Sequence, residues 1–155
     1  MLKKFILLVI PMLLTACASS LKVLELPQVK TDSRLFVITQ QFPQSEKSLL
    51  AIEVQPHQWR WVQTDPLGAP IARLILSKAG WQNDGFVMPN KQAKQLFSAI
   101  ATYFMSTMIF DVQQISENEY AQNHRLIWRF SPQKHGVNIE LGDKSVWFVE
   151  PLRLN

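Results

Sequence analysis

The stretch from Asn90 to Met108, NKQAKQLFSAIATYFMSTM, decides the fold of this chain. Its apolar residues recur every three or four positions for about five turns, and Asn90, after Pro89, is a good N-terminal cap. Lys91 and Lys94 stand in the first turn, where the helix dipole disfavours cations by a few tenths of a kcal/mol. The sequence predicts an amphipathic helix about 28 Å long. Its apolar face consists of Ala93, Leu96, Phe97, Ile100, Ala101, Phe104, Met105 and Met108.

On both sides of this helix the apolar residues alternate with polar ones, as is typical of β-strands. Strands are predicted at 34–42, 48–55, 57–64 and 71–76 before the helix, and at 125–130, 137–141 and 145–150 after it. A short hairpin is predicted at 81–87, and residues 116–123 fit a short helix or a loop. Short polar turns between strands indicate an antiparallel meander, so the fold class is α+β. Bulky apolar residues on both faces of several strands indicate that each face of the sheet needs cover. The helix can cover one face, and curling of the sheet, a partner or a ligand must close the other.

The start of the chain has the layout of a secretory signal. Two lysines precede an apolar run at 5–14, and the small residues Thr15 and Ala16 follow it. A helix that spans a bilayer needs roughly twenty apolar residues, so this run is too short to remain as an anchor. The next residue, Cys17, is the only cysteine of the chain. An ordinary secretion signal with a buried cysteine nearby is the alternative reading.

Leu14-Thr15-Ala16-Cys17 resembles the lipobox of bacterial lipoproteins, in which the cysteine is acylated and becomes the first residue. The resemblance implies removal of residues 1–16 and attachment of acyl chains, such as palmitate, to Cys17. Several acyl chains hold a protein stably on a membrane. Ala18 follows instead of Asp, which resembles the sorting rule that sends lipoproteins to the outer membrane of Gram-negative bacteria. We therefore expect a lipid-anchored protein that faces the periplasm.

Without residues 1–16, 139 of the 155 residues remain, enough for one domain. We expect a lipidated tether at 17–33, part of which could pack down through its leucines, and a single domain at 34–155. The formal charge of +4 falls to +2 because two lysines leave with the signal. This small charge, with no run of five basic residues, gives no reason to propose nucleic acid as a partner. With Cys17 modified, no disulfide can form.

No constellation of residues indicates catalysis. His57, His124 and His135 each fall in or beside a predicted turn, and none has a partner at metal-ligand spacing. There is no Gly-x-Ser-x-Gly elbow and no glycine-rich phosphate loop. The sequence therefore predicts no enzyme, no metal and no cofactor, although a site assembled from distant residues stays open.

Asp65-Pro66-Leu67-Gly68 is a predicted tight loop with an unusual tip. Pro fixes one φ angle and Gly permits a positive one, whereas a large apolar residue such as Leu67 is rare at this position. Leu67 either folds back onto the strands or projects to contact a membrane or a lipid.

The segment Trp59–Gly68, WRWVQTDPLG, followed by an apolar strand and a helix, resembles the LolB family. LolB is the outer-membrane receptor that takes lipoproteins from the carrier LolA. More closely, the pattern at 50–68 and the helix before Asp111 resemble a family of small lipoproteins encoded beside aryl-polyene pigment biosynthesis genes. The resemblance implies an antiparallel incomplete β-barrel with a helix across its concave face, a cavity for acyl chains and a projecting Leu67. It also implies a periplasmic LolA-like carrier as a partner.

These observations lead to a hypothesis of lipid binding or transfer without a chemical reaction. The ligand would be lipid-like and apolar: the acyl chain of a lipoprotein, a phospholipid or an aryl-polyene lipid. A lining that contains methionine suits such a carrier because Met adapts its shape. The six candidates for the lining are Trp59 and Trp61 on the sheet and Phe97, Phe104, Met105 and Met108 on the helix. Ordinary core packing is the alternative for all six, and a structural or adaptor lipoprotein that holds a protein partner is the alternative function.

Overall fold

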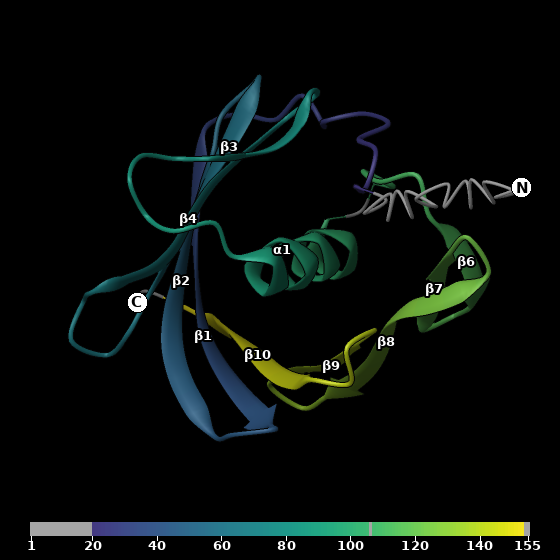
Figure 1. Ribbon diagram of the computed structural model, residues 1–155. Helices are drawn as coiled ribbons and strands as arrows, with labels where there is room; N and C mark the ends of the chain where they lie inside the picture. The colour runs from purple at the N-terminus through teal and green to yellow at the C-terminus, as the bar shows by residue number, and fades with distance from the viewer. Residues whose placement is uncertain (1–19, 106, 154–155) are drawn as a thin grey trace, which may run out of the picture.

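The computed structural model describes residues 20–105 and 107–153. The signal at 1–16, Cys17 and Ala18 lie outside these residues. Within the described ranges, ten strands form one antiparallel sheet that curls around a single helix (Figure 1). The sheet stays open, because its two edge strands do not pair with each other. The expected α+β class with an incompletely closed antiparallel sheet is therefore confirmed.

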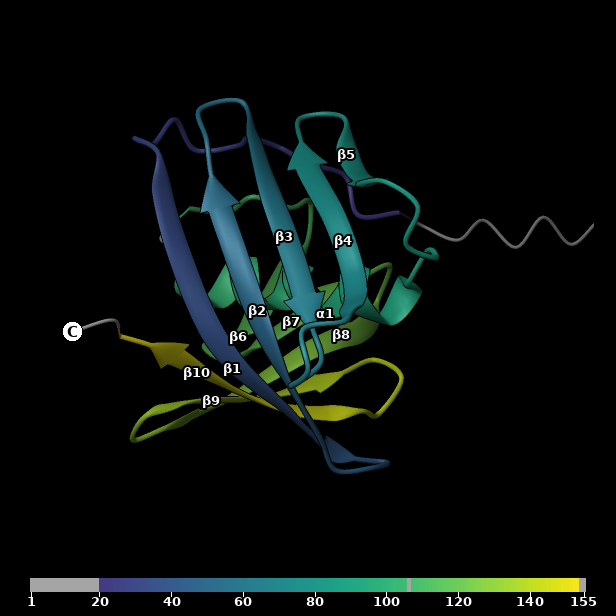
Figure 2. The ribbon, with the colours of Figure 1, turned by 90° about the vertical axis from the view of Figure 1, so that its left-hand side faces the viewer.

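Two consecutive five-stranded meanders build the sheet, in the order β5-β4-β3-β2-β1-β10-β9-β8-β7-β6. Pairing of β1 with β10, for example Ile38 with Val149, joins them. Figure 2 shows the first meander face-on. The elements are β1 (Asp32–Phe42), β2 (Glu46–Val54), β3 (Gln58–Thr64), β4 (Pro70–Ser77), β5 (Gly80–Asn83), α1 (Lys91–Phe104), β6 (Gln113–Ser116), β7 (Glu119–Gln122), β8 (Arg125–Gln133), β9 (Gly136–Leu141) and β10 (Val146–Leu152).

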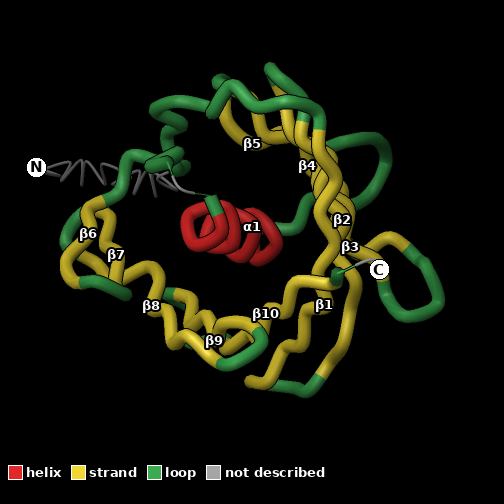
Figure 3. The backbone as a smooth tube through the Cα atoms, turned by 180° about the vertical axis from the view of Figure 1, so that it is seen from behind, coloured by secondary structure: helices red, strands yellow, loops and turns green. Residues whose placement is uncertain are grey.

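The sheet buries one face only. Side chains alternate across a strand, and in β3 the buried Trp59 and Trp61 face α1 while Arg60 lies on the outer face. The outer face carries exposed apolar side chains, among them Leu49 of β2, which is 45% exposed. Curling brings the concave face around α1 (Figure 3), so one helix is enough to cover it.

Helix α1 has 14 residues and is about 21 Å long. The Asn90 side chain caps it by accepting a hydrogen bond from the Ala93 N–H at 2.9 Å, as predicted. The helix ends at Phe104, earlier than the predicted Met108, because Met105 is extended. Beyond it Ile109 and Phe110 are fully buried, and the chain must leave the helix to bring them into the core.

Two local predictions are wrong. The hairpin expected at 81–87 is instead formed by β4 and β5 across the turn at Lys78 and Ala79, and a loop follows Asn83. Residues 116–123 form neither a helix nor a loop but most of the hairpin of β6 and β7, which turns at 117–118. This polar hairpin shows little hydrophobic alternation, so its sequence does not predict strands. Antiparallel pairing of β7 with β8 joins it to the sheet.

Part of the expected tether belongs to the domain. Val23 and Leu26 are each only 6% exposed, whereas Leu24 is 46% exposed. The Leu24 N–H donates to the Ile109 carbonyl at 2.8 Å, and Val23 forms a β-bridge with Phe110. The domain therefore begins well before residue 34, because these apolar side chains cover the core where the sheet stays open.

Candidate functional site

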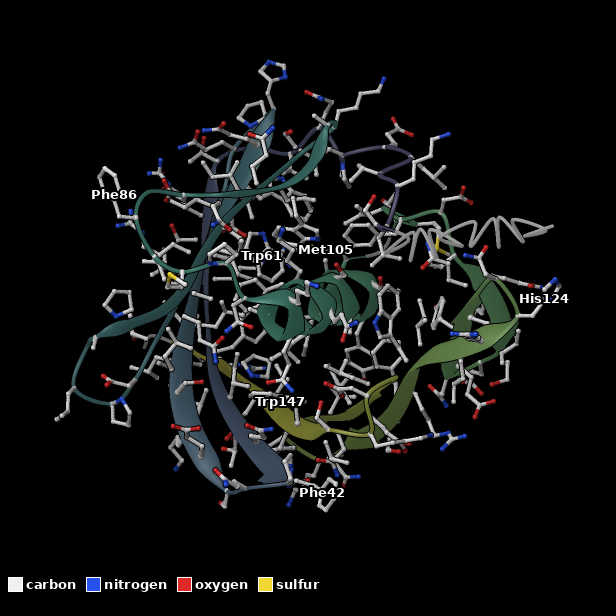
Figure 4. The ribbon with its side chains drawn as sticks, viewed as in Figure 1. Phe42, Trp61, Phe86, Met105, His124 and Trp147 are labelled. Atoms are coloured by element: carbon white, nitrogen blue, oxygen red, sulfur yellow. The ribbon has the colours of Figure 1, made fainter. Side chains whose placement is uncertain are left out.

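The six predicted lining residues do not share one site. Trp61 and Phe97 are fully buried and stack with ring centroids 5.2 Å apart, between the sheet and α1 (Figure 4). Trp81 meets the Trp61 ring edge-on at 5.4 Å. Core packing, the alternative weighed for all six, describes Trp61 and Phe97, and Trp59 is also fully buried in the same core.

Three of the other candidates meet at a cleft near the C-terminal end of α1. Trp59, Phe104 and Met105 line this space of about 520 Å³. Phe104 packs against Phe36 at 4.9 Å, and the Arg34 guanidinium donates a hydrogen bond to the Met105 sulfur at 3.2 Å. The sixth candidate, Met108, is 40% exposed and is not part of this lining.

The interior also contains two unsatisfied donors. The indole N–H groups of Trp59 and Trp61 are buried and have no hydrogen-bond acceptor within the described residues. Buried indoles usually have one, and leaving a buried donor unpaired costs about 1–3 kcal/mol. The contact region between β3 and α1 is therefore not fully satisfied by the protein's own groups.

Leu67 projects from the molecule. It is 95% exposed at the loop between β3 and β4, so the alternative in which it folds back onto the strands is wrong. The Asp65 carboxylate accepts hydrogen bonds from the N–H groups of Leu67 and Ala69, both at 2.9 Å, and Gly68 adopts φ +89°. These bonds hold the loop in one shape and present Leu67 to solvent.

A second exposed apolar group, which the sequence analysis missed, follows β5. In the loop between β5 and α1, Phe86 is fully exposed and Met88 is 81% exposed. Asp84 fixes the base of this loop through ion pairs with Arg60 at 3.0 Å and Arg73 at 3.2 Å. Both loops bulge from the convex side of the sheet, whereas the described N-terminal segment begins at the open side and crosses the molecule to β1 (Figure 3).

A cleft with an apolar lining lies at the open side of the sheet, and we call it the open-side cleft. Its volume is about 570 Å³, within the range of small-molecule sites. It lies where the two edges of the sheet fail to meet, between β5, α1, β8 and the N-terminal segment. The apolar part of its lining consists of Leu21, Val23, Trp81, Ile127 and Trp128.

Hydrogen bonds and ring contacts hold the floor of the open-side cleft in place. The Trp81 indole donates to the Ser98 hydroxyl at 2.8 Å, and that hydroxyl donates to the Lys94 carbonyl at 2.7 Å. Trp81 also stacks with Phe110 at 6.5 Å. Trp81, which forms part of the floor of the cleft, is therefore fixed to α1.

Four lysines line the same cleft: Lys22, Lys78, Lys91 and Lys94. No residue of the lining is acidic, and none of the four ammonium groups forms an ion pair with any described residue. The sequence held one signal for this site, because Lys91 and Lys94 stand at the helix end that disfavours cations. Lys22, Lys78 and the apolar floor gave none, since only the fold brings them together.

The three histidines and the shifted carboxyl groups lie apart from the open-side cleft. His57, His124 and His135 lie in bends or turns, and no group of three potential metal ligands occurs among the described residues. Two carboxyl groups have shifted pKa values, and both serve structure. A hydrogen bond from Arg129 lowers the pKa of Glu119, and the pKa of Asp143 is lowered because bonds from Ser145 and Gln92 outweigh its burial.

No helix within residues 20–105 and 107–153 is long and apolar enough to cross a membrane. Comparison of the chain with protein-family models finds no match, and comparison with curated proteins finds none either. The relationship to LolB and to the aryl-polyene lipoproteins therefore stays a prediction from the motif around Leu67.

Proposed function

We propose that this protein is an outer-membrane lipoprotein that faces the periplasm and binds or transfers a lipid-like apolar ligand in its open-side cleft. The observation that carries the proposal is the apolar lining of that cleft, about 570 Å³ in volume, at the place where the sheet does not close. The lipobox-like Leu14-Thr15-Ala16-Cys17 supports the location, and the resemblance to LolB supports the ligand class. The proposal involves no reaction.

Transfer of this kind depends on differences in burial. Each methylene moved out of water contributes about 0.8 kcal/mol, so a few methylenes in the cleft give measurable affinity. A carrier must release its ligand as well as bind it, and a cleft that covers only part of an acyl chain fits this need. A periplasmic LolA-like carrier would be the donor, with a lipoprotein, a phospholipid or an aryl-polyene lipid as the ligand.

The test is to purify the full chain from membranes in mild detergent and measure non-covalently bound lipid by native mass spectrometry. We expect bound lipid in the wild type and its loss in Ile127→Asn, which places an amide in the cleft lining. Ile115→Asn is the matched control, because Ile115 is 51% exposed on β6 and is not part of the lining. Equal lipid content in both variants, or none in the wild type, would contradict the proposal.

A second candidate function, an adaptor that holds a protein partner, is favoured by the exposed Leu67, Phe86 and Met88. Their loops lie on the convex side of the sheet, away from its open side, where the described chain begins at Ser20 (Figure 3). Side chains on that side are suited to contact a partner away from the anchoring membrane. A photo-crosslinking residue in place of Phe86 tests this function: capture of one protein that the double variant Phe86→Ala, Met88→Ala no longer binds would support it.

A further inference from the structure

We infer that the open-side cleft selects an anionic phospholipid from the bilayer that anchors the protein, with the phosphate of the headgroup among four lysines and an acyl chain along the apolar floor. This inference rests on the proposed function and adds the class of ligand. It combines three observations: the charge of the rim, the apolar floor and the position of the cleft in the chain.

Positive charge is concentrated around the open-side cleft, because half of the described lysines line it. The described residues contain eight lysines, and four of them, Lys22, Lys78, Lys91 and Lys94, line this one cleft. No acidic residue lines it, and the first turn of α1 carries none. Ammonium groups without protein partners attract an anion from solution or from a membrane surface.

The lysines come from three separate elements. Lys22 belongs to the N-terminal segment, Lys78 to the turn before β5, and Lys91 and Lys94 to the first turn of α1. The helix dipole adds positive potential where the last two stand, so their placement disfavours the helix slightly. An anionic ligand would reverse this effect, since it neutralises the lysines and interacts favourably with the same helix end.

An apolar floor beside the rim excludes a simple inorganic anion as the best ligand. The half-buried Trp81 and Ile127 offer ring and aliphatic surface that a phosphate ion alone would leave uncovered. An amphiphile satisfies both parts, because its chain covers the floor while its headgroup stays at the wet rim. The half-buried Lys94, next to this floor, fits such a boundary.

The position of the cleft indicates the source of the lipid. Ser20 and Leu21 line it, and Ser20 follows Cys17 by three residues. Three extended residues span at most about 10 Å. If Cys17 is acylated, the cleft therefore stays close to the membrane surface, where phospholipid headgroups are the abundant anions.

The experiment uses the acylated full chain, reconstituted into vesicles of equal parts phosphatidylglycerol and phosphatidylcholine with identical acyl chains. The protein is re-extracted in mild detergent, and native mass spectrometry gives the ratio of the two lipids that it retains. We expect at least about tenfold enrichment of phosphatidylglycerol, the order that several weak ion pairs produce together. Raising the ionic strength from about 0.1 M to 1 M should reduce the enrichment, because the Debye length falls from about 10 Å to about 3 Å.

Two quadruple variants form a matched pair. Changing Lys22, Lys78, Lys91 and Lys94 to Gln should bring the ratio close to one while total bound lipid stays measurable. Changing the other four described lysines, Lys30, Lys47, Lys134 and Lys144, to Gln removes the same charge and should leave the enrichment unchanged. Circular dichroism of both variants checks that the sheet is intact.

The outcomes distinguish a failure of lipid selectivity from a failure of lipid binding itself. Retention of both lipids in equal amounts would overturn the selectivity and leave lipid binding standing. Retention of neither lipid would overturn the proposed function itself, including the case in which the protein's own acyl chains fill the cleft. Equal loss of enrichment in the two quadruple variants would show a general charge effect and would also overturn the inference.

Discussion

Replacing Phe97 with alanine tests whether the space between the sheet and α1 is packed core or ligand lining. Phe97 is fully buried, stacks with Trp61 at 5.2 Å and meets Trp81 at 6.0 Å. Truncation of a buried Phe costs about 3–5 kcal/mol, and the two ring contacts place Phe97→Ala in the upper half of that range. A small domain has about 5–15 kcal/mol of stability in total, so the variant should fold with a large loss.

The assay is urea unfolding followed by tryptophan fluorescence. With an m-value of about 1–3 kcal/mol per molar urea, the midpoint should fall by about 2 M. Phe86→Ala is the matched control, because Phe86 is fully exposed and its truncation should change stability by less than about 0.5 kcal/mol. A loss below about 1 kcal/mol for Phe97→Ala would refute the assignment of Phe97 to the core. It would indicate instead a loosely packed interior that a ligand completes.

Four further outcomes are expected. Leu67→Glu should change the free energy of unfolding by less than about 0.5 kcal/mol, because Leu67 is 95% exposed. The same variant should reduce ligand delivery to membranes. An unfolded variant would show instead that Leu67 is part of the core. Leu26→Ala should cost about 2 kcal/mol in urea unfolding, and no loss would mean that the N-terminal segment is a free tether. Cys17→Ala should abolish incorporation of labelled palmitate and membrane retention in cell fractions, and unchanged labelling would reject the lipobox. Asp143 has a lowered folded pKa, so the stability it contributes is present above its unfolded pKa of about 3.9 and is lost as pH falls through the lower folded value. The difference in thermal midpoint between wild type and Asp143→Asn should therefore shrink as the pH falls below 4, and a constant difference would contradict this assignment.

Much of the fold could be predicted from hydrophobic periodicity because strongly patterned elements bury a regular face. The start of α1 was predictable from Asn90 and the three–four spacing, and the side chains of Trp59 and Trp61 fall on the buried face as alternation requires. The end of α1 was not, since Met105 and Met108 continue the helical pattern while burial of Ile109 and Phe110 requires extended chain. Tertiary packing thus overrides local pattern at that point.

The site was harder to predict than the fold. Hydrophobicity identified large residues such as Trp61 and Phe97, but these two side chains are fully buried in the core. The open-side cleft depends instead on a sheet that stops before closing, and no local pattern encodes that. Lys91 and Lys94, set against the helix dipole, were a sequence signal near the cleft, but no site was predicted from them.

The positions of the open-side cleft and of the two exposed loops bear on whether lipid binding and partner binding are compatible. The cleft includes residues three and four positions after Cys17, whereas the Leu67 and Phe86 loops lie on the opposite side. If Cys17 is acylated, a domain held by so short a link does not place both surfaces on one bilayer at once. Under the proposed function the lysine-rimmed cleft would then face the anchoring membrane, and the loops would be available to a partner in the periplasm. On this reasoning the two functions are compatible, because a carrier that binds the loops and a lipid that binds the cleft would occupy opposite sides of the same domain.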